Sequence, residues 1–142
     1  MDTDELEHHL SQRPQMGHDR LQDVPPSPGV YVAWLDNPTQ CLYVGMAGNL
    51  YRRIRSHFSG QRGGDQFCLY VCDRYVFPEL CRSGEPPATD EINRATRAWI
   101  RRHVTFQVLA LPAAESREAE RQLQRKLQPI LNPLPEGGDG ST

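Results

Sequence analysis

Two short tripeptides near the start of the chain carry tyrosines that could take part in chemistry. They are Gly29-Val30-Tyr31 and Tyr43-Val44-Gly45, and eleven residues separate the two tyrosines. Arg53 and His57 follow them, and Glu120 lies far along the chain. A phosphoryl group under attack needs a guanidinium for its developing charge, a carboxylate that holds a cation, and groups that orient a water and take its proton. These side chains together supply the parts of a metal-assisted phosphodiesterase site.

The arginine and the histidine lie on a predicted helix. Asn49 can cap a helix that runs to Phe58, because its side chain can accept a backbone N–H of the first turn. Arg53 and His57 are four residues apart, on one flank of the apolar stripe of this helix. Taken alone, a surface arginine with a packed stem and a histidine at the edge of the core would be the plainer explanation. The combination with the tyrosines and the glutamate favours a shared site.

Glu120 lies on a second predicted helix, from about Ala114 to Leu127. Helical spacing places it at the border of the apolar stripe, whereas most other acids of this helix lie on the opposite side. An ionised carboxylate near a core edge is costly unless a cation or a donor lies beside it. A salt bridge to Arg117, or a hydrogen bond to Gln124, is the alternative explanation for this glutamate.

The remaining elements predict how these side chains are positioned. Residues 30–35 and 40–44 are β-rich and flank a turn at Asp36–Thr39, which indicates a hairpin. A further helix should run from Thr89 or Asp90 to about His103 and lead into a strand at 104–111. We therefore expect an α+β fold, an α/β sandwich in which a small, mainly antiparallel three-stranded sheet is flanked by helices.

The other segments are less regular. Residues 66–73 are expected to be a short strand or an extended piece, and residues 74–88 to be irregular. Residues 1–27 form an acidic segment that we expect to be mobile, with a possible short helix at 3–12. Residues 28–133 would then be the folded domain, with an insert at about 60–88, and residues 134–142 a flexible tail.

Composition narrows the class of protein. The 142 residues are enough for one domain with a real core. No apolar run approaches the ~20 residues of a membrane span, and the first thirty residues lack a signal-peptide pattern, so we expect a cytoplasmic protein with no membrane partner. The four cysteines form no C-x-x-C pair, so free thiols are a plainer interpretation than a structural zinc site.

The net charge of −2 is unevenly distributed along the chain. Residues 1–23 carry six acidic residues and two arginines, which leaves a net charge of +2 on the rest of the chain. Fifteen of the sixteen basic residues are arginine, whose planar fork suits phosphate, although such a bias can also reflect genome composition. Charge alone therefore does not decide whether the partner is a nucleic acid.

Across residues 28–133 the chain resembles the GIY-YIG endonucleases. Gly29-Val30-Tyr31 and Tyr43-Val44-Gly45 stand where the family has its two tripeptides. The family's arginine, ten residues after the second tyrosine, corresponds to Arg53, and the histidine or tyrosine four residues later corresponds to His57. The family's glutamate, twelve residues before an asparagine in a segment that ends K-x-x-P-x-x-N, corresponds here to Glu120 and Asn132.

The resemblance implies a one-metal hydrolysis of DNA that leaves 5′-phosphate and 3′-hydroxyl ends. Glu120 would hold Mg²⁺ or Mn²⁺, the hard cations that suit oxygen ligands. Tyr31 is the candidate acceptor of the water's proton, as a phenolate tuned by its surroundings, while Tyr43 and His57 would orient that water or relay the proton. Arg53 would bind the nonbridging phosphate oxygens. The sixth residue of the set, Asn132, would support the site through hydrogen bonds.

The chain also departs from the family pattern. Valine replaces isoleucine in both tripeptides, and Met46 stands where many members carry lysine. The insert from Gly60 to Pro87 is longer than in compact repair nucleases, and is either a substrate-specificity element or a plain surface loop. Further DNA contacts are expected from six arginines, although a solvated helix face explains those after position 90 equally well; the six are Arg52, Arg55, Arg62, Arg94, Arg97 and Arg101.

Two other functions remain open at this point. A nuclease-fold module that binds DNA or a protein partner without cutting is the first, and a zinc-stapled structural domain is the second. The intact set of Tyr31, Tyr43, Arg53, His57 and Glu120 favours the enzyme. Whether the DNA is single-stranded, duplex or branched, and whether the chain forms oligomers, is left open. DNA repair, a mobile element and phage defence fit the sequence equally well.

Overall fold

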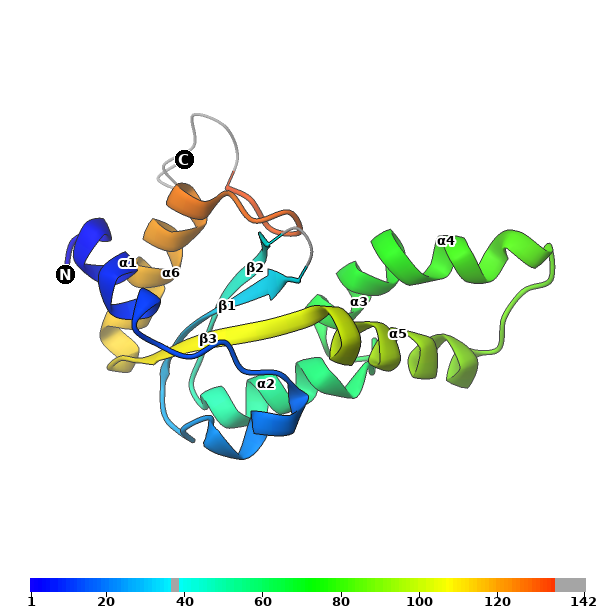
Figure 1. Cartoon of the computed structure of the whole chain (residues 1–142), viewed down its shortest axis with the longest axis horizontal. Helices are drawn as coiled ribbons and strands as arrows, with labels where there is room; N and C mark the ends of the chain where they lie inside the picture. Colours follow the sequence, from blue (N-terminus) through cyan, green and yellow to red (C-terminus); the bar gives the residue numbers. More distant parts are fainter. Residues whose placement is uncertain (37–38, 135–142) are drawn as a thin grey trace.

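A three-stranded antiparallel sheet forms the centre of the protein (Figure 1). The computed structural model describes residues 1–36 and 39–134. The strands are β1 (Gly29–Leu35), β2 (Gln40–Ala47) and β3 (Val104–Ala110), in the spatial order β2-β1-β3. The predicted antiparallel α+β fold is confirmed. The two central residues of the predicted hairpin turn, 37 and 38, lie outside the described residues, as do residues 135–142 of the predicted tail.

Helices cover both faces of this sheet. The α-helices of the described residues are α1 (Thr3–Ser11), α2 (Leu50–Ser59), α3 (Gln66–Val71), α4 (Phe77–Leu80), α5 (Thr89–His103) and α6 (Ala113–Leu127). Val30 and Val32 of β1 belong to the core that α1 and α6 form on one face. Tyr31 and Ala33 point to the other face, where α2, α3 and α5 pack. The tyrosine of the first tripeptide therefore lies on the side of the helix that carries Arg53 and His57.

The prediction of an extended segment at 66–73 is wrong, because these residues are helical. Asp65 caps α3 by accepting the backbone N–H of Cys68, and Phe67, Cys68 and Val71 are buried at helical spacing. A turn of π-helix at Cys72–Val76 then leads into α4, so the predicted irregular segment is also partly helical. In Figure 1 the part of the chain from α3 to α5 projects away from the sheet as a helical arm.

The N-terminal segment packs against the domain, in contrast to its predicted mobility. Asp2 caps α1, and the buried side chains of Leu6 and Leu10 contact the core beneath α6. Further along, Met16 exchanges two backbone hydrogen bonds with Phe106 of β3, at 2.8 and 2.9 Å. Two apolar side chains at i and i+4, together with this backbone pairing, attach an otherwise acidic segment.

The described residues also bear on the cysteines and on membranes. Three of the four thiols, those of Cys41, Cys68 and Cys72, are buried, and Cys81 is exposed. None of the helices in the described part of the chain combines the length and the apolar character that a membrane crossing requires.

Candidate active site

The glycines of the two tripeptides make room for the site. Tyr31 pairs with Gly45 across β1 and β2. A Cβ atom at position 45 would overlap the hydroxyl and the ring of Tyr31, so only glycine leaves space for this tyrosine. A Cβ at Gly29 would likewise overlap the carbonyl oxygen of Leu109 on β3. The tripeptides are therefore packing motifs as much as chemical ones.

Tyr31, His57 and Asp65 form a line of hydrogen bonds beneath the surface. The Tyr31 hydroxyl lies 2.7 Å from Nε2 of His57. The Nδ1 atom of the same ring lies 2.8 and 3.0 Å from the two carboxylate oxygens of Asp65. All three residues are buried, with exposed fractions of 0, 2 and 6 %. The carboxylate also accepts the Ser56 hydroxyl and the backbone N–H of Cys68, at 2.9 Å for the second bond.

The pKa values assign the protons along this line. Burial lowers the pKa of His57 below 6.5 against the opposing effect of Asp65, so the ring is neutral at neutral pH. Burial acts to raise the pKa of Asp65, but its hydrogen bonds from His57, Ser56 and Cys68 lower it to about 2. Because the carboxylate only accepts, Nδ1 carries the proton of His57 and Nε2 accepts the hydroxyl proton of Tyr31.

Tyr31 itself is held in the protonated form. Burial, and then the neighbouring Tyr43, raise its pKa well above 10, while the guanidinium of Arg53 acts in the opposite direction through charge and a hydrogen bond. The family resemblance implied a phenolate at Tyr31, and this environment disfavours the charged form of its hydroxyl. The proton of its hydroxyl is directed instead toward His57.

Tyr43 reaches the surface, where it lines a hollow of about 470 Å³ with Arg53, His57 and Asp65. Its ring stacks on Tyr31 with centroids 6.2 Å apart and an interplanar angle of 22°. Burial raises the pKa of Tyr43 to about 12, the carboxylates of Glu120 and Asp65 add to this effect, and Arg53 opposes it. Tyr43 is therefore close enough to Glu120, Asp65 and Arg53 for their charges to change its pKa.

Glu120 reaches the site from the opposite face of the sheet by way of its edge. It is half-buried on α6, and its carboxylate accepts the backbone N–H of Met46 on the edge strand β2. Burial raises the pKa of Glu120, whereas Arg117, the Met46 N–H and Arg53 lower it. The residue after the second tripeptide therefore contributes its backbone to the site, where many members of the family that the sequence resembles carry a lysine.

Asn132 binds the backbone of the second tripeptide. Its side-chain oxygen accepts the N–H of Val44 at 3.1 Å, and its nitrogen donates to the carbonyl of the same residue at 2.6 Å. Ile130 and Leu131 donate to the carbonyls of Cys41 and Leu42. The segment after α6 thus pairs with the outer edge of β2, which leaves that edge covered.

The comparison with known protein families agrees with this geometry. The family model of the GIY-YIG catalytic domain matches residues 27–86. The matched segment, 60 of the 142 residues, is similar to a GIY-YIG catalytic domain. This domain indicates a nuclease family. No curated protein matches the chain.

The GIY-YIG match includes both tripeptides, Arg53 and His57, but it ends before Glu120 and Asn132. Those two residues contact the matched segment in the folded protein, through hydrogen bonds to the backbone of β2. Asp65 lies inside the matched span and was not predicted as a site residue. An aspartate directly before an apolar run is typical of a helix N-cap, and this position could have indicated a helix that begins after Asp65. The expectation of a strand at 66–73 prevented that interpretation.

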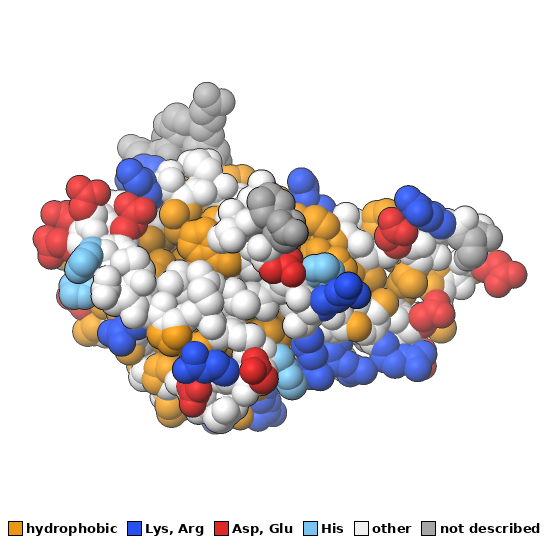
Figure 2. All heavy atoms as spheres, in the orientation of Figure 1, with side chains coloured by type: hydrophobic (Ala, Val, Ile, Leu, Met, Phe, Trp, Pro, Cys, Tyr) orange, Lys and Arg blue, Asp and Glu red, His pale blue; other side chains and the backbone are white. Residues whose placement is uncertain are grey.

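Of the six arginines expected to contact DNA, five lie on α2 and α5, and Arg62 lies in the loop between α2 and α3. Arg52 and Arg55 are exposed on α2, and with Arg101 and His18 they line a second hollow beside the first. On α5, Arg94 and Arg101 are exposed, and Arg97 is half-buried beside Gly60. Arg62 lines the first hollow and donates to Asn93. Figure 2 shows basic side chains gathered along the side of the arm that α5 forms.

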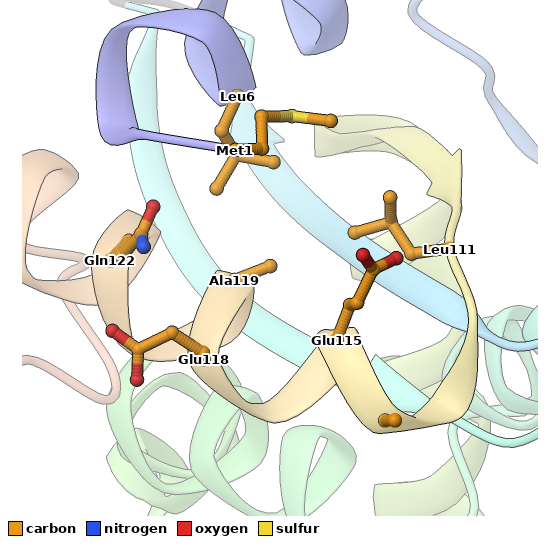
Figure 3. Close-up of a pocket in the computed structure, with 8 residues that line it drawn as sticks. Met1, Leu6, Leu111, Glu115, Glu118, Ala119 and Gln122 are labelled. Atoms are coloured by element: carbon orange, nitrogen blue, oxygen red, sulfur yellow. The ribbon is translucent and has the colours of Figure 1, made fainter.

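A third hollow lies away from the GIY-YIG site, between α1 and α6 (Figure 3). Its volume is about 230 Å³, and Leu6 and Leu111 form part of its wall. Two carboxylates of α6, those of Glu115 and Glu118, lie at its rim in Figure 3. No residue of the predicted site lines it, so it plays no part in the chemistry considered below.

The donors of the site limit how a metal ion could bind. Within 1–36 and 39–134, no three His, Cys, Asp or Glu side chains converge closely enough to hold an ion. If Glu120 binds a cation, at most one other His, Cys, Asp or Glu side chain of the described residues would join it. One or two carboxylates are enough for a hard divalent cation that keeps several waters alongside the phosphate oxygens of a substrate.

Proposed function

We propose that the protein is an endonuclease that hydrolyses DNA phosphodiester bonds with a divalent cation. One observation carries this proposal. The carboxylate of Glu120 lies outside the matched family segment, yet it binds the Met46 N–H beside the second tripeptide and acts on the hydroxyl of Tyr43 together with Arg53. A fold without a use for the site has no physical need to bring a half-buried carboxylate to this place.

Glu120 would hold Mg²⁺ or Mn²⁺ through its carboxylate. When bound, such a cation neutralises the scissile phosphate and stabilises the negative charge on the leaving 3′-oxygen. The raised pKa of Glu120 agrees with this role, because burial without a bound cation disfavours the charged carboxylate. A cation beside it would offset that penalty.

The remaining residues would bind phosphate and move one proton. Arg53 would bind the nonbridging oxygens in the hollow, and Tyr43 would orient the attacking water. The water would give its proton to the hydroxyl oxygen of Tyr31 as the proton of Tyr31 passes to Nε2 of His57. The hydroxide would then attack phosphorus and break the bond between phosphorus and the 3′-oxygen. The 3′-oxygen would take a proton from solvent, and the His57 imidazolium would return its extra proton to solvent.

The flanking DNA would lie along the arginines of α2 and α5. Arg52, Arg55 and Arg101 line one continuous basic hollow beside the site, and Arg94 continues the exposed basic face along the arm. Contacts of this kind bind phosphates irrespective of sequence and weaken as salt rises.

The test uses end-labelled single-stranded, duplex and branched oligonucleotides with Mg²⁺, with Mn²⁺ or with EDTA. Wild type should cleave at least one of them only with a divalent cation, and leave 5′-phosphate and 3′-hydroxyl ends. Glu120→Ala should lose cleavage, and the matched control Glu118→Ala, an exposed acid on the same helix, should keep it. If the wild type binds DNA but cleaves none of the substrates under any of these conditions, the non-cutting module is favoured instead. Cleavage in EDTA would exclude the metal-dependent mechanism.

A further inference from the structure

Asp65 is the buried charged group of this site that the proposed function leaves without a role. It lies at the end of the loop between α2 and α3, and its side chain is 3 % exposed. Both carboxylate oxygens lie within 3.0 Å of Nδ1 of His57. A carboxylate removed from water in this way is costly, so its partners have to compensate for the lost hydration.

The donors around Asp65 hold the carboxylate in one orientation. The Ser56 hydroxyl, one residue before His57 on α2, donates to one oxygen, and the backbone N–H of Cys68 donates to the other. Because these donors come from two different helices, the carboxylate is clamped between α2 and α3. The imidazole ring lies against Phe67 and Phe106, with centroids 4.6 and 5.9 Å away, which limits its rotation.

The surroundings of His57 therefore determine which of its two ring nitrogens carries the proton. The charged and titratable groups that face it are Tyr31 of β1, Tyr43 of β2, Arg53 of its own helix, Asp65, and Cys68 of α3. Among these, Asp65 is the group that meets Nδ1, and Tyr31 is the group that meets Nε2. A carboxylate at Nδ1 requires a proton there, so Nε2 is left free to accept one.

We propose that Asp65 is a positioning residue that fixes His57 in the tautomer whose Nε2 accepts the proton of Tyr31. This inference rests on the proposed function for its effect on cleavage, but the tautomer can be measured without any cleavage. As His57 takes up that proton, the carboxylate also stabilises the imidazolium that forms. Asp65 touches neither substrate nor metal in this scheme; it acts through His57.

Two substitutions separate this role from the helix cap that Asp65 also provides. Asparagine and serine are both good N-cap residues, so Asp65→Asn and Asp65→Ser keep an acceptor for the Cys68 N–H. In Asp65→Asn, the amide oxygen is needed at that N–H, which turns its NH₂ donor toward Nδ1 and favours the opposite tautomer. Ser56→Ala is the control, because it removes one bond to the carboxylate and leaves the contact with His57 in place.

The tautomer of His57 is read from the side-chain ¹⁵N signals of the free protein, with the signals of His57 assigned through His57→Gln. Wild type and Ser56→Ala should show a protonated Nδ1 and an unprotonated Nε2, and Asp65→Asn should show the reverse. Single-turnover cleavage of the best oligonucleotide should fall by about 10²–10⁴-fold in Asp65→Asn and Asp65→Ser and by less than about tenfold in Ser56→Ala. Binding of the same oligonucleotide in EDTA should stay within about threefold of wild type.

The outcomes separate the two proposals. Cleavage by Asp65→Asn and Asp65→Ser at the wild-type rate, or an unprotonated Nδ1 in the wild type, overturns the role of Asp65 and leaves the endonuclease standing. Absence of cleavage by the wild type overturns the endonuclease, while the ¹⁵N signals still decide whether Asp65 sets the tautomer. A reversed tautomer together with lost cleavage in a folded Asp65→Asn supports both.

Discussion

Gly45→Ala tests whether the second tripeptide makes room for the first. The added methyl group would overlap the hydroxyl oxygen, Cζ and Cε1 of Tyr31. The ring cannot move aside easily, because it packs against His57 and Phe106 with centroids 5.3 and 6.1 Å away and its hydroxyl is bonded to His57. Overpacking of a well-packed core costs roughly 1–3 kcal/mol, and the rigidity of this ring argues for the upper part of that range.

The expected loss in free energy of unfolding is therefore about 2–3 kcal/mol, which corresponds to a decrease of roughly 4–12 °C in Tm for a chain of this size. Cleavage should fall as well, because Tyr31 has to leave its position beside His57. The assays are urea unfolding and single-turnover cleavage. Gly48→Ala is the matched control, since a Cβ there meets nothing within 4 Å, and it should change stability by less than about 0.5 kcal/mol. Equal stability of the two variants would refute the reasoning.

Three further results are expected. Asn132→Ala should lower the free energy of unfolding by about 1–3 kcal/mol and reduce cleavage, because it removes both hydrogen bonds of this side chain to the edge of β2. Gln124→Ala removes a longer hydrogen bond to the same edge, 3.4 Å, and should lower the free energy of unfolding by less in urea unfolding. Because the folded-state pKa of Asp65 is lowered to about 2, its stabilising contribution is present above pH 4 and lost as the pH falls toward 2. As the pH is lowered from 5 to 2, the urea midpoint should therefore fall more steeply in wild type than in Asp65→Asn. Arg55→Ala should lower the salt slope of DNA binding by about 1, and Arg13→Ala, outside the basic hollow, should leave it unchanged in a salt titration.

Much of this site could be predicted from the sequence because its parts lie on strongly patterned elements. The helix that carries Arg53 and His57 has a capping asparagine and a clear apolar stripe, and both signals are local. The place of Glu120 at the border of a stripe was only part of its prediction, which also needed the combination with the tyrosines, Arg53 and His57 and the resemblance to the family. Where local pattern and tertiary packing agree, the residue order alone is enough to infer the orientation of a side chain.

The parts that could not be predicted depend on contacts between distant segments. The apolar run at 66–71 is short enough to suit either a strand or a helix, and the packing of Phe67 between His57 and Phe106 decides the choice. The role of Asp65 was missed for the same reason, because its bond to His57 exists only when α3 packs on α2. Leu6 and Leu10 gave too weak a signal against an acidic background for the docking of α1 to be expected.

Cleavage of an end-labelled DNA oligonucleotide by the wild type and by Glu120→Ala, with Mg²⁺ and with EDTA, tests the central claim most directly. The account predicts cleavage by the wild type in Mg²⁺ alone, with a 5′-phosphate on one product and a 3′-hydroxyl on the other, and none by Glu120→Ala. Equal cleavage by the two proteins, or cleavage by the wild type in EDTA, would contradict it.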